Sequence, residues 1–134
     1  MAAGGVDISK IKELKLKIAI TAKGKDLDST MDPRFGRAAY ILIVDTHTDA
    51  LEVLDNSENV NAFKGAGIQA AVMLSDRGAD VLLTGYCGPN AFKTLNTAGI
   101  KVANDVAGTV REALDAFHAG KITLADSANV EAAW

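Results

Sequence analysis

Short runs of apolar residues alternate along the chain with polar and glycine-rich connections. In the first half, apolar runs rich in β-branched residues predict strands at 16–22, 39–45 and 51–54. A short polar turn, 46–49, joins the second run to the third, which is typical of a hairpin. The first half of the chain therefore predicts a three-stranded meander.

In the second half, helical spacing of apolar residues alternates with short buried strands. Strands are predicted at 79–84 and 100–103, and helices over about 66–77, from Pro89 to Gly99 and from Thr109 to Gly120. The first helix carries Ile68, Ala71, Val72 and Ser75 at helical spacing, and Thr109 with Glu112 has the spacing of a capping box. Parallel βα units of this kind have right-handed crossovers. The whole pattern predicts an α/β domain with a mixed five-stranded sheet and three main helices.

The chain has the length of one domain, 134 residues, which is enough to bury a core. We divide it into an N-terminal extension (1–15), an α/β domain (16–120) and a C-terminal tail (121–134) without strong periodicity. The extension could form a short amphipathic helix, with Ile8, Ile11 and Leu14 near one side. A helix this short is marginal alone, so it either docks on another surface or is mobile.

Composition and charge narrow the function classes. The net charge is −3 and the pI is about 5.3, which argues against nucleic acid or an acidic membrane as the main partner. The single cysteine excludes an internal disulfide and an all-cysteine metal cage. The first residues lack the features of a signal peptide, and no apolar run reaches the roughly 20 residues of a membrane span. We therefore expect a soluble cytoplasmic protein.

Two glycine loops are the strongest functional signal, because each lies where a predicted helix begins. The first turn of a helix has backbone N–H groups without intrahelical partners and the positive end of the helix dipole, so it favours anions. Both loops should lie at one edge of the sheet, where ligands bind in open α/β folds. The alternative is that each loop is only a tight helix entry. The predicted binding residues of the two loops are Gly65, Ala66, Gly67, Ile68, Gly85, Gly88, Pro89 and Asn90.

A third loop, Arg34-Phe35-Gly36-Arg37, adds positive charge. Because Pro33 and Gly36 shape this loop, we expect Arg34 and Arg37 to offset the charge of a bound anion, although scattered surface charge is the alternative. For Lys64 the two interpretations are balanced.

Cys87 lies inside the second glycine loop. Most lone cysteines are small buried hydrophobes. A helix N-terminus would lower the pKa of this thiol, however, and the thiolate would suit a soft metal such as copper. Cys87 is therefore a possible metal ligand, whereas we interpret His47 and His118 as surface residues.

Three blocks resemble the dinitrogenase iron–molybdenum cofactor biosynthesis family: Asp-Pro-Arg-Phe-Gly-Arg-Ala at 32–38, Gly-Ala-Gly-Ile-Gln-Ala-Ala at 65–71, and Leu-Thr-Gly with Gly-Pro-Asn-Ala within 83–91. The resemblance covers about 16–120 and is greatest to the small members that carry a molybdenum–copper sulfide cluster. It implies a ribonuclease-H-like fold, no catalysis, and non-covalent carrying of an anionic metal–sulfur cluster. The cargo implied is a molybdenum–copper sulfide cluster or, alternatively, an iron–molybdenum cofactor precursor.

One position departs from the family pattern. Many relatives carry His immediately before the Phe-Gly, where this chain has Arg34. Arginine is not expected to ligate a metal there, but its fixed donors can hold a polyanion.

Three other functions are weighed against the carrier. A nuclease of this fold needs carboxylates that converge on two metal ions, and the first strand contains none. A regulatory or scaffold module would recognise a partner protein without metal. Phosphate or nucleotide binding is the third possibility, although neither glycine loop matches a P-loop or a dinucleotide fingerprint.

Overall fold

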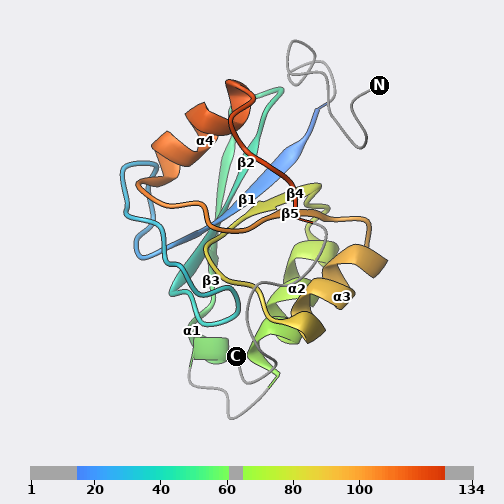
Figure 1. Ribbon diagram of the computed structural model, residues 1–134. Helices are drawn as coiled ribbons and strands as arrows, with labels where there is room; N and C mark the ends of the chain where they lie inside the picture. The colour runs from blue at the N-terminus through green and yellow to red at the C-terminus, as the bar shows by residue number, and fades with distance from the viewer. Residues whose placement is uncertain (1–14, 61–64, 126–134) are drawn as a thin grey trace, which may run out of the picture.

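The computed structural model describes residues 15–60 and 65–125 of the 134-residue chain, and all structural statements concern these residues. Figure 1 shows their arrangement. The elements in chain order are β1 (Lys17–Ala22), β2 (Tyr40–Asp45), β3 (Leu51–Asp55), α1 (Ser57–Val60), α2 (Ala66–Asp76), β4 (Val81–Leu83), α3 (Pro89–Thr97), β5 (Lys101–Ala103) and α4 (Val110–His118).

The described strands form one mixed sheet in the order β3-β2-β1-β4-β5. β2 is antiparallel to β1 and β3, whereas β4 is parallel to β1, and β5 is parallel to β4. Ile18 of β1 lies opposite Val44 on one side and Val81 on the other, so the central strand is hydrogen-bonded along both edges. The predicted meander followed by parallel βα units is confirmed, as is the ribonuclease-H-like strand order.

Helices cover both faces of the sheet. α2 and α3 lie side by side on one face and α4 lies on the other (Figure 1). Alternating residues of β1 feed the two cores: Ala19 points to the α2–α3 side, while Ile18 and Ile20 point to the α4 side. Because β1 is buried on both faces, it is apolar almost throughout.

The four residues at helical spacing do not mark the packed face of α2, because only Ala71 among them is buried. The helix buries Ala66, Ala70, Ala71 and Leu74, whereas Ile68, Val72 and Ser75 are exposed. Apolar residues surround most of this helix, so their spacing alone does not select one side. The side that packs is the one with small residues, which lets α2 approach its neighbours closely.

The predicted capping box at the start of α4 is confirmed. At α4 the Thr109 hydroxyl accepts from the Glu112 amide at 3.1 Å, and the Glu112 carboxylate accepts from the Thr109 amide at 2.8 Å. Gly78 ends α2 with a positive φ, as a C′ glycine does. The polar segment after β3, for which the sequence predicts no element, contains one short helix, α1, which has no buried residue and therefore no apolar pattern.

Some expectations concern residues outside the described ranges: the amphipathic segment at 8–14, Lys64, and the tail beyond Ala125. Within the described part of the tail, the Ala125 amide donates to the Val102 carbonyl of β5 at 2.6 Å. No helix among the described residues is long and apolar enough to cross a membrane.

Candidate functional site

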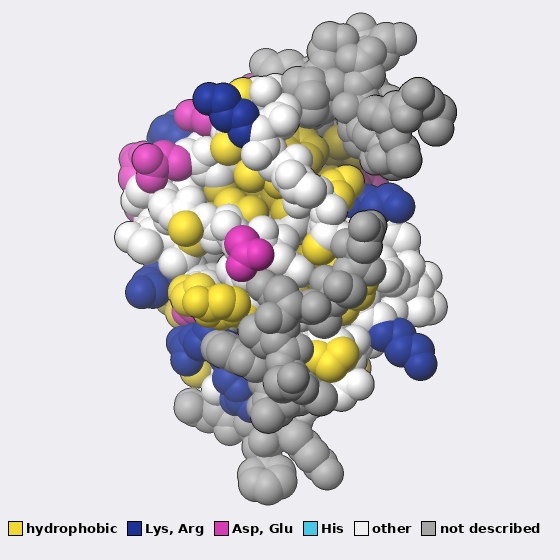
Figure 2. All heavy atoms as spheres, in the orientation of Figure 1, with side chains coloured by type: hydrophobic (Ala, Val, Ile, Leu, Met, Phe, Trp, Pro, Cys, Tyr) yellow, Lys and Arg dark blue, Asp and Glu magenta, His cyan; other side chains and the backbone are white. Residues whose placement is uncertain are grey.

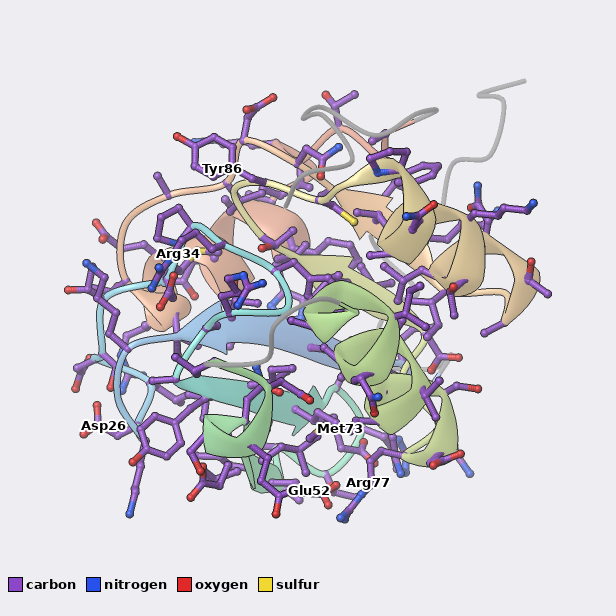
Figure 3. The ribbon with its side chains drawn as sticks, turned by 90° about the horizontal axis from the view of Figure 1, so that it is seen from below. Asp26, Arg34, Glu52, Met73, Arg77 and Tyr86 are labelled. Atoms are coloured by element: carbon purple, nitrogen blue, oxygen red, sulfur yellow. The ribbon has the colours of Figure 1, made fainter. Side chains whose placement is uncertain are left out.

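Three loops meet at the edge of the sheet where β1 and β4 end. We call residues 34–37, 65–68 and 85–90 the loop rim. The Phe35 amide donates to the Tyr86 carbonyl at 3.0 Å, and the Tyr86 amide donates to the Pro33 carbonyl at 2.6 Å. Figure 3 shows Arg34 and Tyr86 on these neighbouring loops. Gly85 completes the contact, because a Cβ on it would lie 2.8 Å from the Cα of Pro33.

Glycines also bring the arginine loop onto α2 and α2 onto α3. Gly36 has a φ of +95°, and a Cβ there would lie 2.7 Å from the amide nitrogen of Gly67. A Cβ on Gly67 would in turn lie 2.9 Å from that of Ala91 in the first turn of α3. The N-termini of α2 and α3 are therefore neighbours. The structure thus brings the three predicted loops together at one edge of the sheet.

Both helix starts have backbone amides without partners in their own helix. The helical bonds begin with Gln69 N–H to Gly65 in α2 and Phe92 N–H to Gly88 in α3. The N-cap residue of each helix is a glycine, which has no side chain that could accept hydrogen bonds from the amides of the first turn. These amides belong to Ala66, Gly67, Ile68, Asn90 and Ala91. Their positive partial charges add to two helix dipoles that point the same way, so the rim favours an anion.

The two arginines differ in their surroundings. Arg34 is exposed, with 45% of its side chain accessible, and its Nε lies 3.4 Å from the buried carboxylate of Asp32. Asp32 also accepts from the Arg34 backbone amide at 3.1 Å, so it orients this arginine while offsetting part of its charge. Arg37 is half-buried and donates to the Val60 carbonyl at 3.0 Å, which ties the loop to α1. Arg34 is thus the more accessible cation of the rim.

The other predicted binding residues differ in how exposed their side chains are. Phe35 is buried in the α2–α3 core, so only its backbone reaches the rim. Ile68 is 41% exposed, and Pro89 and Asn90 are also exposed. On the face shown in Figure 2, Lys and Arg side chains are spread over both the upper and the lower half. Most of the visible acidic side chains lie higher, near α4.

The prediction that the Cys87 thiol has a lowered pKa is wrong. The side chain is completely buried in the α2–α3 core, and this burial raises the pKa of the thiol to about 12. Desolvation of a thiolate outweighs the nearby helix N-terminus here. Its role as a metal ligand stays a prediction, which this burial disfavours. Among the described residues, no group of three or more His, Cys, Asp and Glu side chains could hold a metal ion.

Sequence reasoning missed several buried polar residues that hydrogen-bond to the loops of the rim and hold them in place. Asn56 is buried and donates to the carbonyls of Gly36 at 3.0 Å and Ala38 at 2.9 Å. The two carbonyls that Asn56 binds lie 20 and 18 residues earlier in the chain. Because Asn56 itself lies in a polar segment, no sequence pattern distinguished it from its neighbours. Thr21 donates to the Asp32 carbonyl at 2.6 Å, and its hydroxyl lies 2.9 Å from that of Thr84. This buried threonine pair connects the ends of β1 and β4 under the rim.

The strand order, the two helical layers and the clustered glycine loops define a small α/β protein of ribonuclease-H-like topology. The family model described as dinitrogenase iron–molybdenum cofactor matches residues 16–120. The chain belongs to this family. Among curated protein sequences, none matches the chain significantly.

Solved structures agree with this assignment. The chain is 50% identical to the orange protein of Desulfovibrio gigas, whose apo form superposes with a TM-score of 0.83 over 85% of this chain and 96% of that one. A proposed NifB protein from Thermotoga is 36% identical, with a TM-score of 0.76 over 86% and 97% of the two chains. A proposed dinitrogenase from Methanocaldococcus jannaschii shares the fold at 16% identity, with a TM-score of 0.64 over 84% and 97%.

Proposed function

We propose that this protein binds and carries an anionic metal–sulfur cluster without catalysing a reaction on it. Family membership and the similarity to the orange protein support cluster binding in general. Among the possible cargoes we favour a molybdenum–copper sulfide cluster, with an iron–molybdenum cofactor type of cluster as the alternative. The observation that carries the proposal is the contact between the starts of α2 and α3, which places two glycine-opened helix N-termini beside Arg34.

The donor set fits a cluster that brings its own sulfide ligands. Such an anion needs hydrogen-bond donors and positive potential, which backbone amides and a guanidinium supply. A bare copper ion would instead need soft ligands, and the one thiol, Cys87, is buried and protonated at neutral pH. We propose that the amides of Ala66, Gly67 and Ile68 in α2 and of Asn90 in α3 face the cluster, with Arg34 at its side.

The placement of the strand-end carboxylates speaks against the nuclease alternative. Asp45 accepts from the His47 amide and Asp80 from the Lys17 amide, and both lie at the start of β1, the edge opposite the loop rim. Asp55 lies at the other edge and accepts from the Ser57 amide at the start of α1. Carboxylates on opposite edges of the sheet cannot converge on two metal ions about 4 Å apart.

Reconstitution tests the carrier function. The apo-protein, incubated with tetrathiomolybdate and copper(I) and then desalted, should retain colour together with molybdenum, copper and sulfur in a fixed ratio. Arg34→Ala should weaken retention about tenfold, the effect of one charge-assisted contact. Arg77→Ala is the matched control, since Arg77 is also exposed and paired with an acid, Glu52, but lies at the other end of α2 (Figure 3).

Four outcomes would count against this proposal or part of it. Protein that loses all metal on desalting is not a carrier of this cluster, and equal losses in both arginine variants would remove Arg34 from the site. Thermal stabilisation by nucleotides instead of thiomolybdate would favour the phosphate alternative, because only ligands of the native state raise the melting temperature. Protein that is free of metal when purified from its native cells would favour a regulatory module. A cytoplasmic location stays a prediction.

A further inference from the structure

The described residues cover the α4 face of the sheet only in part. A five-stranded sheet is about 20 Å wide, and one helix with its side chains covers about half of that width. The opposite face has both α2 and α3, whereas α4 lies alone on this one (Figure 1). Ile122 and Leu124 pack on the α4-side core as well, and Ala125 bonds to Val102 of β5. This segment therefore extends the cover towards β5.

Exposed apolar side chains mark the uncovered part of this face, at the opposite edge strand, β3. Leu51 and Val53 are 41% and 39% exposed. Leu51 lies directly opposite Val44 of β2, and Val53 likewise faces its neighbour Leu42. Both β2 residues belong to the α4-side core, and side chains of directly opposed residues share one face. We call Leu51 and Val53 the β3 patch. It continues the α4-side core beyond the cover that the described segments provide.

The N-terminal extension joins the described chain close to this patch. The Leu16 amide donates to the Thr46 hydroxyl at 3.0 Å, and the Thr46 amide donates to the Leu16 carbonyl at 2.8 Å. Thr46 begins the turn into β3, so Leu51 lies at the same edge of the sheet. The Leu16 side chain packs on the α4-side core, which is the face of the patch. From β1 to β3 is two strand spacings, about 10 Å, which seven helical residues can span at ~1.5 Å each.

The sequence of the extension complements this surface in polarity and in charge. Ile8, Ile11 and Leu14 provide an apolar side, and residues 8–15 contain three lysines and one glutamate. The hairpin 45–55 contains four acidic residues and no Lys or Arg. This acidity disfavours a second copy of the chain as the occupant, because pairing two β3 strands would bring like charges together. A basic, amphipathic segment fits the patch better.

We propose that segment 8–14 of the N-terminal extension docks on the β3 patch, with its apolar side against Leu51 and Val53 and its lysines beside the acidic hairpin. The contact removes apolar surface of both partners from water. It also supplies the tertiary packing that a helix of this length needs. The patch lies near the start of β1, whereas the loop rim lies where β1 ends, so docking does not depend on cluster binding.

Cross-linking within the full chain tests this contact. In the variant Ile11→Cys/Val53→Cys, a short bis-maleimide should join the two new thiols of one chain, while the buried Cys87 stays unmodified at neutral pH. The matched control is Ile11→Cys/Val72→Cys, since Val72 is also an exposed valine but lies on α2, on the opposite face. Docking should make the first reaction about tenfold faster, because it raises the effective concentration of the two thiols. Equal rates, or links formed only between two chains, would overturn the proposal.

A double-mutant cycle tests the same contact without a reagent. Ile11→Asp and Val53→Asp should each lower the melting temperature, because each places a charge in an apolar contact. The double variant should melt no lower than the worse single variant, since both changes remove one interaction. Ile11→Asp and Val72→Asp should instead have additive effects, and circular dichroism before each melt shows that the variants are folded. Additive effects in both pairs would refute docking at this patch.

Discussion

Gly36 and Gly67 contact each other backbone to backbone, and the contact joins the arginine loop to the first turn of α2. A methyl group on Gly36 would lie 2.7 Å from both the Cα and the amide nitrogen of Gly67. Real Cβ atoms do not approach backbone this closely, so the loop can lie on α2 only if residue 36 has no side chain. The position of Arg34 beside the helix start depends on this contact.

Replacing Gly36 should therefore loosen the rim. Gly36 and Gly99 both have positive φ, but a Cβ on Gly99 would meet nothing within 4 Å. We expect Gly36→Ala to lower the free energy of unfolding by about 1–3 kcal/mol more than Gly99→Ala, the usual cost of overpacking. Urea denaturation measures the difference. Equal losses would mean that backbone strain alone, and not contact with α2, accounts for the glycine.

Asn56 should hold the arginine loop from beneath. Asn56→Ala leaves the buried carbonyls of Gly36 and Ala38 without their side-chain donor, which costs about 1–3 kcal/mol for each unpaired group. Asn59→Ala removes the bond that Asn59 donates to the Asn56 side chain and a weak one to the Met73 sulfur, leaves no backbone carbonyl unpaired, and should cost about 1 kcal/mol or less. Denaturation midpoints distinguish the two variants. Similar losses would contradict the special role of Asn56.

Cys87 should react slowly and make the protein sensitive to alkali. Its folded pKa of about 12 exceeds the ordinary value of 9.0, so between these values the unfolded thiol loses its proton first. The free energy of unfolding should consequently fall as pH rises above 9.0, and fall less steeply in Cys87→Ala. Thermal melts at rising pH make this comparison. At neutral pH, a thiol reagent should label Cys87 only after the protein unfolds. Rapid labelling of the native protein would refute the burial of this side chain.

Ile68 offers a test in which stability and binding change in opposite directions. Ile68→Glu places a negative charge in the first turn of α2, where the helix dipole should stabilise the fold by about 0.3–1 kcal/mol. The same charge should repel an anionic cluster and reduce the molybdenum retained after reconstitution. Asn96→Glu, near the end of α3, is the control and should leave retention unchanged. Undiminished retention in Ile68→Glu would place the cluster away from α2.

The secondary structure could be predicted well because its signals are local. The capping box at Thr109, the C′ glycine at Gly78 and the β-branched runs each express a preference of a few neighbouring residues. The face of α2 could not be predicted in this way. Its exposed side also carries large apolar residues, Ile68 and Val72, and close packing of small residues against α3 decides which side is buried.

The sequence alone determined the order of strands and helices, the positions of the glycine loops and the family resemblance, because these depend on residue type and spacing along the chain. Only the tertiary structure showed that Arg34 pairs with Asp32, that Arg37 bonds to Val60, and that burial raises the pKa of Cys87. Each of these depends on atoms that the fold brings together or on water that it excludes. Distances and desolvation across packed layers have no counterpart in a linear pattern.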